Sequence, residues 1–159
     1  MTDADVRGLL DREEIRDLAL RYCDAIVRRD VDGVMDVFAE DGEFVVPEQA
    51  FQVDEKAAGS EKAAGSEKAE RRYQGLAALR KMYAESMISP APLPMAGNNI
   101  VRLSGENTAV GRCMAQIRFA HNSKLLSVGY YDDEYVRTPC GWKFKRRRVD
   151  LRPFNRDDK

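Results

Sequence analysis

The sequence is poor in the residue types that build disulfide frameworks and metal centres. It contains three cysteines, Cys23, Cys113 and Cys140, and one histidine, His121. The cysteines are odd in number, far apart and without a CxxC pair, which argues against both a disulfide framework and a zinc site. We therefore expect reduced, mostly buried thiols, and neither a metal nor another cofactor.

An excess of charge of one sign is also lacking. The chain has 26 Lys and Arg residues against 27 Asp and Glu residues, a net charge of −1. This balance provides no field that would gather nucleic acid or an anionic membrane. The one basic cluster, KFKRRR from Lys143 to Arg148, lies on a predicted terminal strand, where charge is more often a solvated face. We therefore expect no nucleic-acid partner.

Long hydrophobic runs are missing as well. The N-terminal stretch MTDADVRGLLDREE has neither the basic start nor the apolar segment of a signal peptide, and no later stretch is apolar enough to span a membrane. There is no glycine-rich phosphate loop. We expect a cytoplasmic protein with no membrane partner. Its 159 residues, 43% of them hydrophobic, suit one compact domain over residues 1–159.

The clearest periodic pattern lies near the start of the chain. Between Ile15 and Ile26, apolar residues fall on one side of a helical wheel and charged residues on the other, which predicts an amphipathic helix. Asp30 can cap a second helix, whose apolar side reaches Phe38. A short strand is predicted from Glu43 to Val46.

A low-complexity stretch follows between Asp54 and Glu70. The text EKAAGS repeats there with a period of six and is made of Glu, Lys, Ala, Gly and Ser. The repeat has no large apolar side chain that could pack into a hydrophobic core, and no apolar face recurs at helical spacing. We interpret residues 54–70 as a solvated insertion in a surface loop, and we expect the fold to survive deletion of residues 55–68.

The second half of the sequence turns from helix to strand. Residues 75–87 have the core spacing of a third helix, and three prolines after it forbid helix. An alternation of period two then predicts four strands joined by short turns, at residues 98–103, 108–120, 125–137 and 142–151. The predicted fold is α+β: a cone-shaped, curved antiparallel sheet packed against three N-terminal helices and enclosing a small-molecule pocket.

Four stretches resemble a known family in the right order. RYCDAIVRRDVDGVMDVFAEDGEF, GLAALRKMY, AGNNIVRL and GYYDDEYVRTPCGWKF are similar to the SnoaL-like family of the nuclear transport factor two-like superfamily. That superfamily includes SnoaL polyketide cyclases, scytalone dehydratase, ketosteroid isomerase and a dehydrochlorinase. The resemblance implies a homodimer formed through the sheet. It implies a cofactor-independent dehydratase, isomerase or cyclase for an apolar polyketide-, terpenoid- or steroid-like substrate, or alternatively a non-catalytic ligand-binding or structural subunit.

Apolar residues occupy several of the family's catalytic positions. Where dehydratase-type relatives carry an aspartate in a string like ALDRRD, the string AIVRRD has Val27, and PMAGN places Pro94 where a histidine would stand. Val46, in FVVP, stands where ketosteroid isomerase has its general base. The resemblance therefore implies an apolar pocket lined by Val27, Val46 and Pro94, without the usual Asp/His dyad.

Polar groups remain at two other family positions. By the resemblance, Tyr22 matches a tyrosine that donates to a developing oxyanion, and Asp133 matches a strand carboxylic acid, so that together they would stabilise an enolate or transfer a proton. From the residues alone, Tyr22 is equally a core tyrosine with a satisfied hydroxyl, and Asp133 equally a solvated strand edge. Strand register and the alignment add Cys113 and Tyr131 to the pocket lining, with Tyr131 positioning the ligand.

Three reactive residue types have simpler interpretations. Asp24 lies opposite the apolar stripe, next to Arg21 and Arg28 at helical spacing, and is expected to form a surface ion pair. His121, in the predicted turn HNSK, is expected to be polar surface. Cys113 has no visible base to activate it and is expected to be a small buried hydrophobe.

Overall fold

The computed structural model of the protein describes residues 2–47, 70–88, 92–119, 122 and 124–153. Apart from Glu70, the repeat insertion predicted over residues 54–70 lies outside the described residues, and so does His121. The interpretations of both, and the assignment of a single domain, stay predictions. Within the described part of the chain, no helix combines the length and the apolar character that crossing a bilayer requires.

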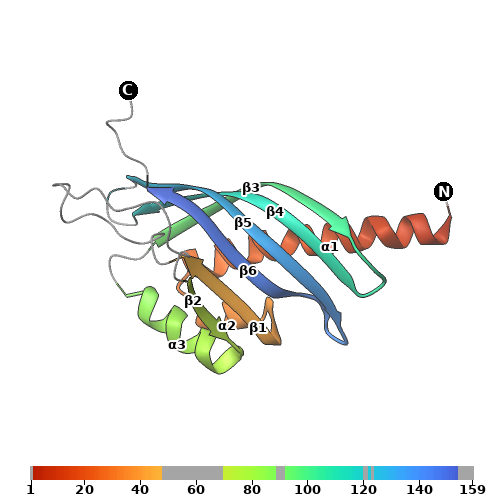
Figure 1. Ribbon diagram of the computed structural model, residues 1–159, viewed down its shortest axis with the longest axis horizontal. Coiled ribbons are helices and arrows are strands. Elements are labelled where there is room, and N and C mark those ends of the chain that lie inside the picture. The colour runs from red at the N-terminus through yellow and green to blue at the C-terminus, as the bar shows by residue number, and fades with distance from the viewer. Residues whose placement is uncertain (1, 48–69, 89–91, 120–121, 123, 154–159) are drawn as a thin grey trace.

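A long amphipathic helix, α1 (Asp3–Val27), opens the fold. Thr2 and Asp5 cap it reciprocally: the Thr2 hydroxyl accepts a hydrogen bond from the backbone N–H of Asp5, and the Asp5 carboxylate accepts one from the backbone N–H of Thr2. The predicted apolar face is buried, from Ile15 at 0% exposure to Ile26 at 6%. The first turns of α1 project beyond the sheet (Figure 1).

A short helix and two strands follow α1. Asp30 caps α2 (Val31–Met35) as predicted, by accepting a hydrogen bond from the backbone N–H of Gly33. The helix ends earlier than expected, because residues from Phe38 onward already belong to β1 (Phe38–Pro47). The strand β2 (Glu70–Gln74), which the pattern analysis missed, pairs antiparallel with β1. Its residues ERRYQ carry charge where a half-buried strand usually carries apolar side chains.

Six strands form one curved sheet in the order β2-β1-β6-β5-β4-β3. The predicted antiparallel meander is confirmed as β3 (Pro92–Leu103), β4 (Thr108–Phe119), β5 (Leu125–Thr138) and β6 (Gly141–Pro153). β1 pairs parallel with β6, so the sheet is mixed rather than wholly antiparallel. Pro92 and Pro94 lie in β3, where the edge position tolerates a residue without an N–H group.

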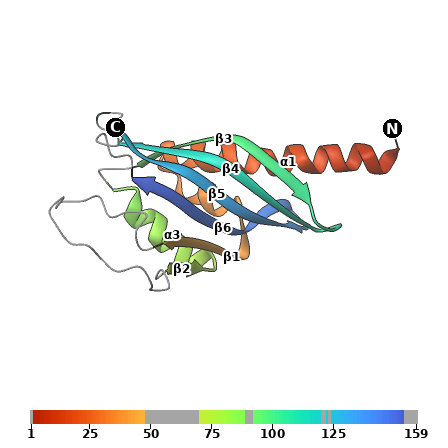
Figure 2. The ribbon, with the colours of Figure 1, turned by 45° about the horizontal axis from the view of Figure 1, so that its top comes forward.

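The helices and the concave face of the sheet enclose the core. The third predicted helix is confirmed as α3 (Leu76–Ser86), which lies on the β1–β2 side, whereas α1 lies along the β3 side (Figure 2). Between them are packed the aromatic rings of Tyr22, Phe38, Tyr83 and Phe144. This arrangement is the α+β cone that the sequence predicts.

A β-bulge decides which side chains of β6 point inward. Glu134 of β5 pairs with Arg146 and Tyr135 pairs with Phe144, so Lys145 is an extra residue on β6. One extra residue reverses the alternation that follows it. The buried side chains of β6 are Trp142 and Phe144 before the bulge, and Arg147, Val149 and Leu151 after it.

Candidate ligand-binding site

An open pocket of about 440 Å³ lies between the helices and the inner face of the sheet. This volume falls in the range of roughly 300–1,000 Å³ that is typical of small-molecule sites. Most of the lining is aliphatic or aromatic. The lining residues are Tyr22, Ile26, Phe44, Val46, Arg71, Tyr73, Met82, Tyr83, Glu85, Ser86, Pro92, Pro94, Ile117, Phe119, Leu126 and Tyr131. The cone fold therefore contains the pocket that was expected of it.

Two tyrosine hydroxyls meet at this pocket. Tyr22 on α1 and Tyr83 on α3 share a hydrogen bond of 3.0 Å between their hydroxyl oxygens. Burial raises the pKa of Tyr22 well above its ordinary value, and it also raises the pKa of Tyr83. Both phenols therefore stay protonated. Only one of the two hydrogens is used within the pair, so the other is available to an oxygen atom in the pocket.

Tyr131 contributes a third hydroxyl. Its ring is 2% exposed and packs edge-on against Tyr22, with 6.0 Å between the ring centroids. Burial raises the pKa of Tyr131 well above its ordinary value, so it too is a hydrogen-bond donor at neutral pH. Its hydroxyl makes no side-chain hydrogen bond with any residue that the structure describes, although it lines the pocket. This group is therefore free to contact a ligand.

A buried guanidinium lies directly beneath the aromatic floor of the pocket. Arg147 is 0% exposed, and its guanidinium carbon lies 4.1 Å from the ring centroid of Tyr131, 4.2 Å from that of Phe144 and 4.4 Å from that of Tyr22. Such contacts with the faces of aromatic rings stabilise a cation that has lost its water. The pocket floor therefore has a fixed positive charge behind it.

Asp133 is the counter-ion of Arg147. Its carboxylate accepts hydrogen bonds from Nε and Nη2 of Arg147, both at 2.9 Å, and from the Tyr135 hydroxyl at 3.1 Å. Burial raises the pKa of Asp133, and the charge and hydrogen bonds of Arg147 oppose that rise. Burial lowers the pKa of Arg147, but the pairing with Asp133 outweighs it and holds that pKa well above its ordinary value. A buried, bidentate ion pair is the result.

Unpaired polar atoms lie in the same interior layer. Nη1 of Arg147 is buried without a hydrogen-bond partner, and so are both amide atoms of Asn99. Asn99 lies in the irregular part of β3 that faces the Cys113 region of β4, and Nη2 of Arg147 lies 3.4 Å from the Cys113 sulfur. Buried groups of this kind are costly unless they are hydrogen-bonded. The layer beneath the pocket thus contains polar groups that are only partly hydrogen-bonded.

Four of the seven predicted site residues line the pocket: Tyr22, Val46, Pro94 and Tyr131. Val27 does not line it. Its side chain is 52% exposed at the end of α1, and Ile26 takes the place in the pocket. Cys113 is buried as predicted, beneath the pocket rather than in its lining, and burial raises the pKa of its thiol to about 11.

The structure differs from the expectation at the basic cluster of β6. The interpretation of Lys143 to Arg148 as a solvated face is wrong for Arg147, which is wholly buried. Strict alternation from Phe144 would point Arg146 inward. The bulge at Lys145 places Arg147 there instead. Counting back from the apolar Val149 would have indicated the inward position.

Two further pocket residues were not among the predicted site residues. Tyr83 belongs to the predicted third helix, but only the packing of α3 against α1 brings its hydroxyl to Tyr22. Arg71 belongs to the unpredicted strand β2 and lies at the pocket. The predicted surface pair of Asp24 is confirmed, with its carboxylate 2.9 Å from Nε of Arg28.

A larger but more open depression lies at the opposite end of the sheet. It has a volume of about 1140 Å³ and is bordered by β1, the β5–β6 turn and several charged side chains, including Lys143 and Lys145. It contains none of the predicted site residues. Among the described residues, no group of three or more His, Cys, Asp or Glu side chains could hold a metal ion. The aromatic pocket is therefore the better candidate site.

Comparison with known proteins gives matches along nearly the whole chain. A family model described as a SnoaL-like domain matches residues 7–148. An uncharacterized protein of Mycobacterium tuberculosis strain H37Rv is 31% identical over 157 residues, which covers 95% of this chain and 91% of that protein. An uncharacterized protein of Mycobacterium bovis matches to the same extent.

Solved structures share the fold. A protein of unknown function from M. tuberculosis superposes with a TM-score of 0.72 at 21% identity, covering 97% of this chain and 77% of that one. An NTF2-like protein with a cystatin-like fold from Novosphingobium aromaticivorans gives 0.68 at 22% identity, with 98% and 89% covered. A protein named provisionally as a scytalone dehydratase, from the same species, gives 0.65 at 18%, with 93% and 90% covered. Identities this low establish the shared fold alone.

Proposed function

Because this chain belongs to the SnoaL-like family, we propose that it binds a small, largely apolar molecule with a hydrogen-bonding oxygen in the pocket between α1, α3 and the sheet. The observation that carries the proposal is the set of three buried phenol hydroxyls in a mostly apolar cavity. Tyr22 and Tyr83 form a pair with one spare hydrogen, and Tyr131 has no described partner. Apolar pockets with a few convergent polar groups are typical ligand sites.

The phenols suit a carbonyl or hydroxyl oxygen. Their raised pKa values keep them protonated, so each acts as a neutral donor. The rings of Phe44 and Tyr73, with Val46 and Pro94, provide apolar contact for the body of the ligand. A ligand with one polar end and an apolar frame would be oriented with its oxygen towards the tyrosines.

A second candidate function is a cofactor-independent isomerase, dehydratase or cyclase that uses the same donors. Charge that develops on a ligand oxygen would be stabilised by hydrogen bonds from Tyr22 and Tyr83, with the fixed charge of Arg147 behind the floor. In this proposal Tyr22 keeps the role of oxyanion donor. Asp133 becomes a positioning residue, because its carboxylate is occupied by Arg147 and Tyr135.

The apolar lining favours binding over chemistry. A proton-transfer mechanism needs a titratable base within reach of the substrate. Among the described lining residues, Glu85 is the one carboxylate, and it is exposed on α3. Val46 and Pro94 stand where relatives would carry catalytic groups. We therefore place ligand binding first and catalysis second.

Binding is tested with a pair of naphthalene probes. Acetonaphthone carries a ketone oxygen, whereas ethylnaphthalene has a similar shape without it. We expect Tyr22→Phe and Tyr83→Phe to weaken acetonaphthone binding about three- to tenfold, the loss of one hydrogen bond, and to leave ethylnaphthalene within twofold. Tyr130→Phe, on the outer face and 45% exposed, is the matched control. Equal binding of both probes by every variant would overturn the donor role of the tyrosines.

Catalysis is tested by proton exchange at the carbon next to a carbonyl. If the pocket stabilises an enolate, tetralone in deuterated water should exchange its α-hydrogens faster with the protein than without it, and Tyr22→Phe should remove most of the gain. Proton NMR follows the exchange. Binding of the ketone without faster exchange would leave the protein a ligand-binding module.

The predicted homodimer remains a proposal, as does a cytoplasmic location. Met114 and Tyr130 are neighbours in the β4–β5 register on the outer face of the sheet, and they are 36% and 45% exposed. Ile100 on β3 adds an apolar side chain that is 71% exposed. A second copy packing through the sheet would cover these side chains. Light scattering coupled to gel filtration measures the mass directly, and Met114→Asp should shift a dimer towards monomer.

A further inference from the structure

Two consecutive arginines of β2 face opposite sides of the sheet. In a strand, successive side chains alternate between faces. Arg71 pairs with Val46 in the β1–β2 register and lines the apolar pocket, together with Tyr73 two residues on. Arg72 points to the outer face. The two side chains therefore have the same chemistry and nearly the same backbone position, but different surroundings.

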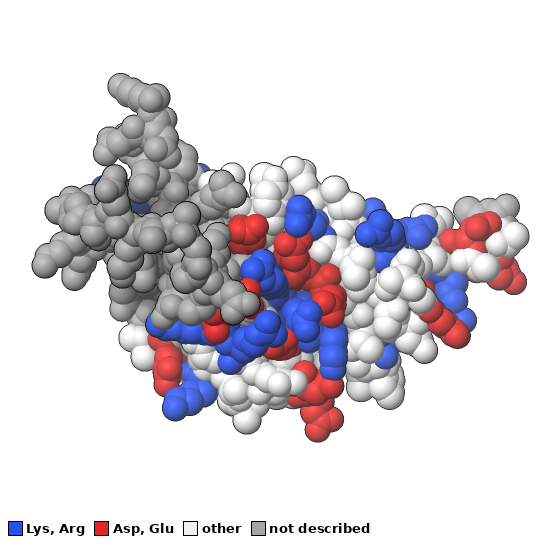
Figure 3. All heavy atoms as spheres, viewed as in Figure 1, with Lys and Arg blue, Asp and Glu red and all other residues white. Residues whose placement is uncertain are grey.

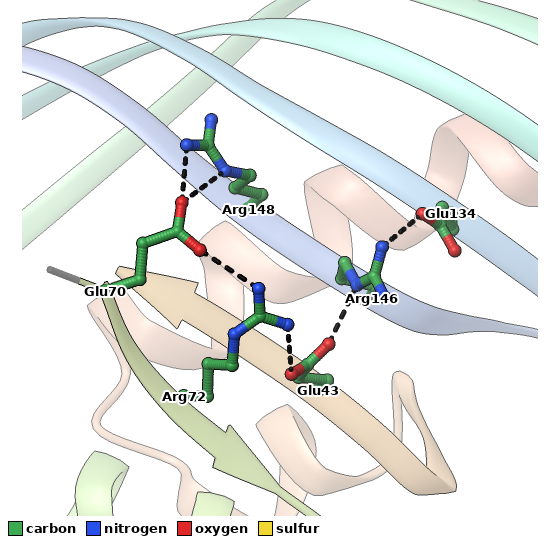
Figure 4. Close-up of polar contacts among 6 residues, drawn as sticks. All are labelled: Glu43, Glu70, Arg72, Glu134, Arg146 and Arg148. Atoms are coloured by element: carbon green, nitrogen blue, oxygen red, sulfur yellow. Dashed lines mark hydrogen bonds and ion pairs between the residues drawn. The ribbon is translucent and has the colours of Figure 1, made fainter. Parts of the chain in front are cut away.

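The guanidinium of Arg72, on the outer face, forms ion pairs with two carboxylates of the protein. Arg72 reaches Glu43 at 3.2 Å and Glu70 at 3.1 Å. These two glutamates also bind Arg146 and Arg148, and Arg146 extends the network to Glu134 (Figure 4). Positive and negative side chains accordingly interleave over the middle of this face (Figure 3). The network neutralises itself and offers no spare cation.

The inner guanidinium has no such partner. Arg71 makes no ion pair and no side-chain hydrogen bond with any residue that the structure describes, whereas Arg72 beside it makes two. Glu85 also lines the pocket and does not pair with Arg71. The guanidinium is exposed, so water satisfies it in the absence of a ligand. An apolar pocket thus has a cation on its lining with nothing described to neutralise it.

From this arrangement we propose that the ligand is an amphipathic organic acid, whose anionic group binds Arg71 while its apolar body fills the pocket. This inference rests on the proposed function, and adds the charge of the ligand and its orientation. A carboxylate or sulfonate would receive a charge-assisted, potentially bidentate hydrogen bond from the guanidinium. The opposite end of the molecule would lie against Tyr22 and Tyr131 at the floor.

The exposure of Arg71 determines how this contact should behave. A solvent-accessible ion pair is screened by salt, because the Debye length falls from about 10 Å at 0.1 M to about 3 Å at 1 M ionic strength. Binding of an anionic ligand should therefore weaken as salt is added. Binding of a neutral ligand with the same frame should not weaken, since apolar burial is insensitive to screening.

The test uses two fluorescent probes that share an aromatic frame. Anilinonaphthalene sulfonate is anionic, and phenylnaphthylamine is its neutral analogue. We expect Arg71→Gln to raise the Kd of the sulfonate about five- to tenfold and to change that of the amine less than twofold. Arg71→Lys should restore most of the sulfonate affinity, because it keeps the charge. Arg72→Gln, one residue away on the other face, is the matched control and should alter neither Kd by more than twofold.

The outcomes separate this inference from the proposed function. If both probes bind and Arg71→Gln affects their Kd values equally or not at all, the pocket binds ligands but Arg71 does not select anions. That result would overturn this inference and leave the proposed function intact. If neither probe binds the unaltered protein, the proposed function fails and the inference with it. Thermal midpoints of all variants, measured alongside, should agree within a few degrees. A large drop for Arg71→Gln would assign the residue to the fold instead, which also contradicts the proposal.

Discussion

The two faces of β6 put three consecutive arginines into opposite environments. Arg146 and Arg148 lie on the outer face with side chains 41% and 40% exposed, whereas Arg147 between them is 0% exposed. Arg146 binds Glu43 and Arg148 binds Glu70, and Arg72 connects these two glutamates in a network open to water (Figure 4). The inner arginine has one carboxylate, Asp133, and three aromatic rings.

The difference teaches that the number of ion pairs says little about their energetic weight. In water, the attraction between exposed charges is screened and is offset by the entropy of holding two long side chains in place. In the interior, each charge has lost its hydration, so the loss of one partner leaves the other uncompensated. We therefore expect variants of β6 to differ greatly in their effect, although the residues are adjacent and identical.

The largest effect should follow from Arg147→Met. This change leaves the Asp133 carboxylate buried with only Tyr135 as a hydrogen-bond donor, and breaking a buried pair in this way costs about 3–5 kcal/mol. The free energy of unfolding, from urea titration, measures the loss. Because only the Tyr135 hydrogen bond would then oppose the effect of burial, the pKa of Asp133 should rise further in the variant. The variant should consequently be less destabilised near pH 4 than at pH 7.

A double variant sharpens this prediction. Asp133→Leu together with Arg147→Met removes both charges, and its loss of stability should be smaller than the sum of the two single losses. Strict additivity would contradict the assignment of a coupled ion pair.

The next effect concerns a second buried carboxylate, Asp11 on α1. Burial acts to raise its pKa, but hydrogen bonds from Arg137 and Trp142 outweigh burial, and the pKa is lowered. Asp11→Asn should cost about 2 kcal/mol at pH 7, the scale of a hydrogen bond to a charged group. Because the pKa of Asp11 in the folded protein lies below its ordinary value of 3.8, the ionised carboxylate stabilises the folded protein at pH values above 3.8. This stabilisation is lost as the pH falls through the folded-state pKa.

The pH dependence supplies the check for Asp11. The difference in unfolding free energy between the unaltered protein and Asp11→Asn should shrink as pH falls below about 4, where the unfolded-state carboxyl becomes protonated. Thermal unfolding at several pH values measures it. A difference that stays constant from pH 7 to pH 3 would show that charge is not the cause.

A smaller effect is expected for the tyrosine pair at the pocket. Tyr83→Phe leaves the Tyr22 hydroxyl without its partner at 3.0 Å, which should cost about 1–2 kcal/mol. A ligand whose oxygen atom takes the position of the Tyr83 hydroxyl should restore part of the lost unfolding free energy. Denaturation with and without acetonaphthone makes the measurement. An unchanged stability would mean that water replaces Tyr83 fully.

The smallest effect should come from the outer face. Arg146→Gln removes contacts with Glu43 and Glu134, and its cost should be at most about 1 kcal/mol because the side chain is 41% exposed and its ion pairs are open to water. The cost should fall further in 1 M salt. Unfolding at two salt concentrations checks this. A loss equal to that of Arg147→Met would remove the distinction between the two faces.

Most of the fold could be predicted from local patterns. The apolar stripe of α1 and the alternation in β4 to β6 reflect the periods of helix and strand, so the ends of β4, β5 and β6 were predicted within a few residues. The starts of α1, at Asp3, and of β3, at Pro92, lie well before the predicted ones. The strand β2 was missed because ERRYQ is charged, and its role as a sheet edge depends on pairing with β1. The parallel pairing of β1 with β6 joins residues about a hundred positions apart, which no local pattern encodes.

The candidate site was predicted in part. Tyr22, Val46, Pro94 and Tyr131 lie in the pocket lining, and their roles in binding or catalysis stay predictions. Val27 was assigned one position too far along α1, where the helix turns its side chain towards solvent. Asp133 was predicted as a candidate acid without its partner, because alternation counted forward from Phe144 does not show the bulge at Lys145 that brings Arg147 inward.

The sequence by itself determined most of the helices and strands, the buried face of α1 and the apolar character of the pocket, because these follow from periods of 3.6 and 2 and from the residues present. The tertiary structure alone decided which charges are buried. The bulge turned Arg147 into the core against Asp133, and the packing of α3 brought Tyr83 to Tyr22. The tertiary structure also places Arg71 at the apolar pocket, whereas Arg72 pairs with two carboxylates. Partners across a curved sheet depend on register, which is a property of the assembled strands rather than of any one of them.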